Sequence, residues 1–64
     1  MKLIITHISD GESKTKTIYP MSYANVPGFH TFTMVDGNEI MYMKAVTKHF
    51  EKTGDTIKMT INWD

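Results

Sequence analysis

The chain has 64 residues and a mass of 7.4 kDa, which is enough for one domain spanning residues 1–64. Seven basic and seven acidic side chains balance at a formal net charge of zero, and cysteine is absent. Disulfides and thiolate metal sites are therefore excluded. No apolar run is long enough for a signal peptide core or a membrane span, so we expect a soluble, cytoplasmic domain.

The first predicted elements are two strands joined by a tight turn. Lys2–Ser9 is apolar on both faces, which is typical of a central strand. Lys14–Tyr19 has a polar face that carries two lysines, and Pro20 ends the strand. Both features indicate an edge strand. Asp10-Gly11 between them supplies the positive φ angles that hairpin turns require.

The next segment, Met21–Gly28, is predicted to be a loop that is unusually apolar for a connection. One interpretation is that its side chains plug one end of the domain. The other is a binding rim that presents Tyr23 and Phe29 to a partner. Phe29–Val35 is predicted to be the third strand, followed by a turn at Asp36-Gly37.

Residues 39–52 fit two structures. As a helix over about 38–53, the segment has one apolar stripe and a capping box at Asp36 and Glu39. As a long strand, a bulge near Lys44-Ala45 bends it and keeps its apolar residues on one side. We favour the strand, because Asp36-Gly37 and Gly54-Asp55 then both form hairpin turns.

The last strand, Thr56–Trp63, alternates cleanly between apolar and polar residues. One face carries Ile57, Met59, Ile61 and Trp63. This parity favours a core position for Trp63, and an exposed interface anchor is the alternative.

The expected fold is all-β: a five-stranded antiparallel meander that curls into an SH3-like or OB-like barrel. The alternative is an α+β fold, in which one helix at about 38–53 covers an antiparallel sheet. A domain of this size has a small core and no disulfides, so close packing or self-association has to supply its stability.

Catalytic and metal sites are not expected. The three histidines, His7, His30 and His49, lack metal-ligand spacing, and most acidic residues lie in or beside turns. No serine lies in a nucleophile motif, and no glycine-rich phosphate loop is present. We therefore expect no enzyme, no cofactor and no small-molecule substrate.

The favoured function is a non-catalytic protein-interaction module, a small adaptor or inhibitor that binds a partner protein or its own copies. Short strands with Asp-Gly turns are common in small bacterial and phage-type accessory proteins. The candidate anchors are Tyr23, Phe29 and Trp63, with Lys44 and Lys48 as charges at the rim.

The alternative function is binding of single-stranded nucleic acid by a lysine and aromatic face. Small five-stranded barrels commonly bind in this way. The zero net charge and the absence of arginine weigh against it, because phosphate neutralisation would depend on lysine clusters alone.

Overall fold

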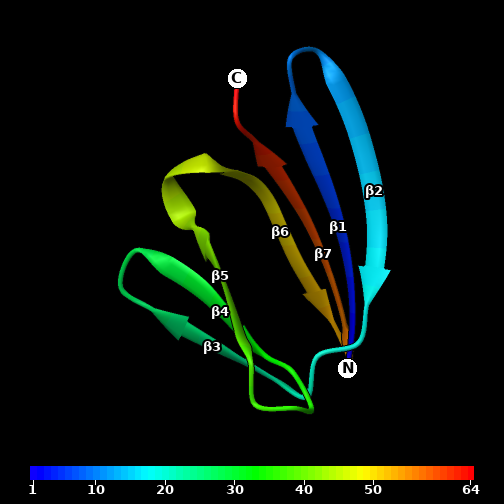
Figure 1. Ribbon diagram of the computed structural model, residues 1–64, viewed down its shortest axis with the longest axis vertical. Helices are drawn as coiled ribbons and strands as arrows, with labels where there is room; N and C mark the ends of the chain where they lie inside the picture. Colours follow the sequence, from blue (N-terminus) through cyan, green and yellow to red (C-terminus); the bar gives the residue numbers. More distant parts are fainter.

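The computed structural model describes residues 1–64 and contains seven strands in two sheets, so the expected all-β class is confirmed (Figure 1). The strands are β1 (Lys2–Ser9), β2 (Glu12–Ile18), β3 (Ser22–Val26), β4 (Phe29–Thr33), β5 (Glu39–Met43), β6 (Thr47–Thr53) and β7 (Thr56–Asn62). A short 3₁₀ turn, η1 (Lys44–Val46), separates β5 from β6. The helix of the α+β alternative is absent.

The larger sheet has the strand order β2-β1-β7-β6, and the smaller sheet has the order β3-β4-β5. Four ladders are antiparallel, as expected, but β1 and β7 pair in parallel. The expected five-stranded antiparallel meander is therefore wrong in its number of strands and in the direction of this ladder. The chain turns back between β2 and β3 and between β5 and β6 as well as at its four hairpin turns (Figure 1), and the last strand runs in the same direction as the first.

The predicted turns are confirmed. Asp10 and Gly11 join β1 to β2 with φ values of 54° and 74°, the positive pair that a type I′ turn needs. Gly54 joins β6 to β7 at a φ of 60°. The Asp36 carboxylate accepts hydrogen bonds from the backbone and side-chain amides of Asn38 and so closes the β4–β5 turn. The same carboxylate was expected to cap a helix in the α+β alternative.

The long bent strand predicted over residues 39–52 is present as β5 and β6, with its bend at η1. The bend lies where a bulge was expected, and the β6–β7 register also shifts between Thr47 and His49. The turn lets one continuous segment contribute β5 to the smaller sheet and β6 to the larger one.

The prediction of a loop at Met21–Gly28 is wrong, because residues 22–26 form β3 and pair with β4 from Ser22↔Thr33 to Val26↔Phe29. The pairing satisfies the backbone groups of a segment that is too short to show alternation clearly. Pro27 and Gly28 form the turn to β4, with Gly28 at a φ of 81°.

The core lies between the two sheets. The larger sheet contributes its buried side chains from β1 and β7, and the smaller sheet contributes from β4 and β5; together they are Leu3, Ile5, Ile57, Met59, Ile61, Phe32 and Tyr42. Trp63 lies outside this core with 49% of its surface exposed, so the core position favoured for it is wrong. It lies just beyond β7, where the opposite sheet no longer covers the strand. Closure of the two sheets into an SH3-like or OB-like barrel stays a prediction.

Candidate functional site

The small sheet, β3-β4-β5, turns one face toward the core. Register places six residues on this inner face in two rows, Tyr23–Phe32–Ile40 and Asn25–His30–Tyr42. Phe32 and Tyr42 belong to the buried core, and Tyr23 and Ile40 pack against it. Because neighbouring residues of a strand point to opposite faces, the remaining residues of the sheet point away from the core.

The outer face of the small sheet consists of nine residues in three rows: Ser22–Thr33–Glu39, Ala24–Thr31–Met41 and Val26–Phe29–Met43. Its largest side chains do not pack against the core cluster. Met41, in the middle of the β4–β5 ladder, is 51% exposed, and Met43, at its end, is 42% exposed. Methionine is flexible and polarisable, and it is common on adaptable binding surfaces.

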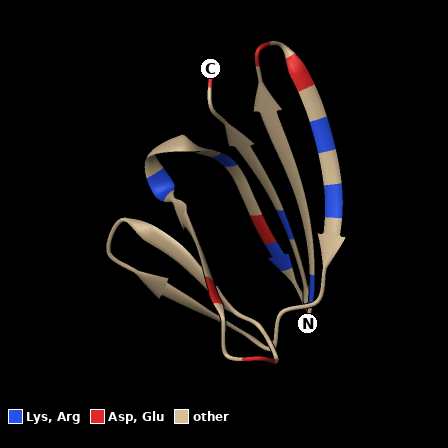
Figure 2. Ribbon diagram, in the orientation of Figure 1, with Lys and Arg blue, Asp and Glu red and all other residues tan.

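Charge is almost absent from the small sheet. Its three five-residue strands carry one charged side chain, Glu39. By contrast, every strand of the larger sheet carries at least one lysine (Figure 2). A surface with a single charge that exposes two methionines beside a half-buried phenylalanine has the composition of a protein interface core.

Thr31 lies at the centre of the outer face and is only 8% exposed. Its hydroxyl Oγ1 is buried and has no hydrogen-bond partner. A buried hydroxyl without a partner is destabilising, and most such groups in folded proteins are satisfied. The outer face therefore contains one unmet hydrogen-bonding group as well as its apolar side chains.

The structure places Tyr23 on the inner face, within an aromatic cluster. Its ring lies 5.1 Å from Phe32 and 5.4 Å from Phe50 between centroids, and its hydroxyl lies 2.8 Å from His30 Nδ1. Burial raises the pKa of Tyr23 above its ordinary value. Burial, and then the charge of Lys44, lower the pKa of His30. Tyr23 thus joins the two sheets, and its expected role in binding a partner stays a prediction.

Phe29 and Lys44 lie at one end of the small sheet, where the Lys44 backbone amide donates to the Gly28 carbonyl over 2.9 Å. The Lys44 ammonium donates to Asn25 Oδ1, on the inner-face side. Lys48 is exposed and lies on β6, in the other sheet. Of the five residues expected to bind a partner, the structure brings only Phe29 and Lys44 together.

Trp63 forms a separate contact just beyond the C-terminal end of β7, in the larger sheet. Its indole Nε1 donates to His7 Nδ1 over 3.3 Å, and the His7 ring lies 5.8 Å from that of Tyr42. Burial, and then Lys16, lower the pKa of His7. His7 also lines a polar hollow of about 260 Å³ with Ser9, Asp10, Glu12 and Lys14. The mixed charges of this hollow point to no single ligand, and no three metal-ligating side chains cluster anywhere in the structure.

Met41, Met43 and Thr31 were not predicted as site residues. The signal that could have found the two methionines is the alternation in Glu39–Met43, since Ile40 and Tyr42 occupy the core parity and leave Met41 and Met43 on the other face. Thr31 gives no such signal, because its burial depends on neighbours from two other strands.

Comparison with protein families, with curated proteins and with solved structures finds no match to this chain. No helix of the structure has the length and apolar character needed to cross a membrane. We therefore infer function from the composition and geometry of the surface itself.

Proposed function

We propose that this chain is a non-catalytic protein-interaction module, a small adaptor or inhibitor that binds a partner protein through the outer face of the small sheet. The observation that carries the proposal is the contrast in charge between the two sheets: one charged side chain in β3-β4-β5 against lysines in every strand of the larger sheet. Charged residues are depleted at interface cores because their desolvation is costly.

In this proposal, Phe29, Met41 and Met43 are the apolar anchors, and Glu39 at the start of β5 is a rim charge. Anchors that are desolvated on binding carry most of the energy of a protein interface. We place the function in the cytoplasm, because a chain without cysteine suits a reducing compartment.

Site-specific photo-crosslinking tests the proposal. A p-benzoylphenylalanine residue is placed at Met41, and in a matched variant at Thr17, which is exposed on the side of β2 away from the core. We expect irradiation in cells to give a covalent protein adduct of discrete mass from position 41 and none from position 17. A Met43→Lys substitution should abolish the adduct. Equal adducts from both positions, or none from either, would overturn the proposal.

The second candidate function is binding of single-stranded nucleic acid near Trp63. Half of this indole is exposed, and it contacts His7, whose Cα partner in β2 is Lys14. An exposed aromatic ring beside lysines suits base stacking and phosphate contact. Asp10 and Glu12 in the same hollow oppose it. Titration of Trp63 fluorescence with single-stranded oligonucleotides at low and moderate salt decides this. A saturable change that weakens steeply with salt supports the candidate, and no change at low salt rejects it.

A further inference from the structure

The outer face of the small sheet is complementary to itself in side-chain size. On β3 the outward residues are small: Ser22, Ala24 and Val26. On β5 they are long: Glu39, Met41 and Met43. β4 lies between these two strands. A two-fold axis along β4 therefore lays the short side chains of one copy against the long side chains of another.

This arrangement also matches the side chains by chemistry. The rotation exchanges the β3 and β5 sides and keeps the three rows aligned. In every row, the β3 residue of one copy therefore faces the β5 residue of the same row in the other copy. Ala24 then faces Met41, and Val26 faces Met43, so apolar groups meet apolar groups. The carboxylate of Glu39 faces the hydroxyl of Ser22, which can donate to it. The two Glu39 side chains lie on opposite edges and do not repel each other.

Thr31 lies in the central row on β4, and so at the two-fold axis. Its buried hydroxyl has no partner within the chain. A hydroxyl both donates and accepts, so a second Thr31 satisfies it directly or through one bridging water once the side chains that cover Oγ1 in the single chain move aside on docking. A group at a two-fold axis has to be complementary to itself, and a hydroxyl meets this condition where a carboxylate or an ammonium does not.

From these observations we propose that the partner bound by the outer face is a second copy of this chain, docked about a two-fold axis along β4. The inference rests on the proposed function, because it uses the same face. Three strands about 4.8 Å apart with five residues each give a face of roughly 14 by 16 Å. This is far smaller than the roughly 800 Å² that each partner buries in a standard interface, so the dimer is weak and concentration-dependent.

The test is analytical ultracentrifugation of the purified full chain from about 10 µM to about 1 mM, a range over which a contact of this size should associate. We expect a shift from monomer to dimer. Ala24→Lys and Met41→Glu should each remain monomeric, because each buries a lone charge at the interface. An equimolar mixture of these two variants should form dimers again, because the new lysine and the new glutamate face each other across the axis. Thr17→Lys is the matched control and should dimerise like the unchanged chain.

Thr31→Val provides a second measurement with opposite effects on folding and association. Removal of the orphaned hydroxyl should raise the melting temperature of the dilute monomer, and loss of the contact at the axis should weaken dimerisation by about threefold to tenfold. If Thr31→Val strengthens both folding and dimerisation, or weakens both, Thr31 does not lie at the two-fold axis.

The remaining outcomes separate this inference from the proposed function. If the purified chain stays monomeric at the highest concentration, and position 41 crosslinks in cells to a different protein, the dimer is wrong and the interaction module stands. If the chain dimerises but a crosslinker at Thr17 captures the second copy, the proposed face is wrong. If position 41 captures nothing and the chain stays monomeric, both proposals fail.

Discussion

The rings of His30 and Phe50 lie parallel, with 4.4 Å between their centroids and 5° between their planes. His30 lies on β4 of the small sheet, and Phe50 lies on β6 of the larger one. No backbone ladder joins these two strands, so the stacked rings and their neighbour Tyr23 connect the sheets through side chains alone. The stability of the domain therefore depends on a few aromatic contacts in addition to its apolar core.

Phe50→Ala should destabilise the protein by about 2 kcal/mol, less than for a fully buried phenylalanine, because the Phe50 ring is only partly buried. Urea unfolding followed by circular dichroism measures the change. Val35→Ala is the control, since Val35 is largely exposed in a turn, and it should change the free energy of unfolding by less than about 0.5 kcal/mol. Equal effects from the two substitutions would show that the ring stack does not join the sheets.

Tyr23→Ala and Phe29→Ala should differ in kind, although both residues were predicted to bind a partner. Tyr23 packs against the core and bonds His30, so its loss should destabilise the fold by about 2 kcal/mol or more. Phe29 lies on the outer face, so its loss should cost under about 1 kcal/mol of stability and abolish association. Urea unfolding and sedimentation of the same samples make the comparison. A larger stability loss from Phe29→Ala would place that ring in the core.

Acid should destabilise the protein through His30. The pKa of His30 is below its ordinary value of 6.5, because burial and then Lys44 disfavour the imidazolium. The folded state therefore favours the neutral ring. The stability that depends on a neutral His30 is fully present above about pH 6.5, the pKa of the unfolded state. It is lost as the pH falls from there through the lower pKa of the folded state.

Melting temperatures measured from about pH 7.5 down to about pH 5 check this dependence. His30→Phe keeps a ring beside Phe50 and should reduce the acid sensitivity. His49→Gln is the control, since His49 is exposed on β6. If His30→Phe leaves the slope of stability against pH unchanged, another group causes the acid loss.

Trp63 should report the protonation of His7. Only a neutral His7 Nδ1 accepts the indole hydrogen bond, and protonation turns this nitrogen into a donor. Burial, and then Lys16, lower the pKa of His7, so the Trp63 emission should change with a midpoint below pH 6.5. His7→Gln should remove the titration. A midpoint at or above pH 6.5 would contradict the lowered pKa.

Several strands could be predicted because their information is local. In β7, apolar residues alternate over seven positions, and β1 is apolar on both faces over eight; Asp10-Gly11 and Gly54-Asp55 mark the reversals beside them. The bend at η1 was also predicted near its correct place, since only a bend keeps both halves of residues 39–52 on their apolar faces. β3 was missed, because a strand of five residues gives too little alternation to distinguish it from an apolar loop.

The candidate site depended on contacts between strands. Tyr23 and Phe29 look equivalent in the sequence, as two aromatic residues near one turn. Pairing of β3 with β4 puts Tyr23 opposite Phe32 on the inner face and Phe29 opposite Val26 on the outer face. A difference of one residue in register would exchange these roles, because side chains alternate along a strand.

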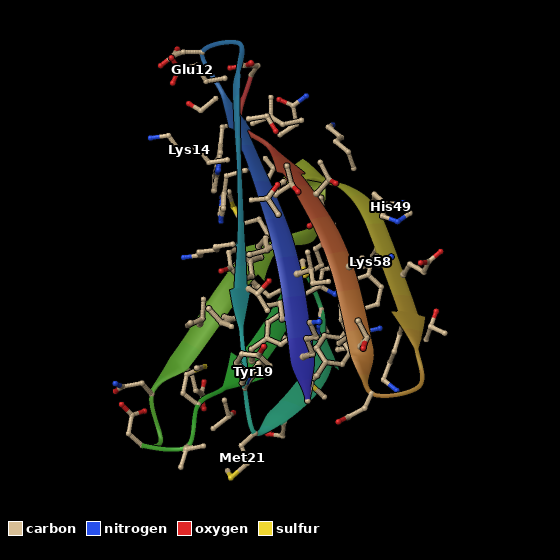
Figure 3. All side chains as sticks on the ribbon, turned by 90° about the vertical axis from the view of Figure 1, so that its right-hand side faces the viewer. Glu12, Lys14, Tyr19, Met21, His49 and Lys58 are labelled. Carbon is tan, nitrogen blue, oxygen red and sulfur yellow. The ribbon has the colours of Figure 1, made fainter.

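Figure 3 views the larger sheet from its solvent side, with His49 and Lys58 on it and Tyr19 and Met21 at one end. The amino-acid sequence by itself determined the all-β class, the turns at Asp10-Gly11, Asp36-Gly37 and Gly54-Asp55, and the apolar patterns of β1 and β7, because these features depend on residues close together in the chain. Only the tertiary structure decided that β1 pairs in parallel with β7, that Trp63 lies outside the core, and that Met41, Met43 and Thr31 share one face on which Glu39 is the single charged residue. Each of these depends on residues distant in the chain, whose pairing no local pattern encodes.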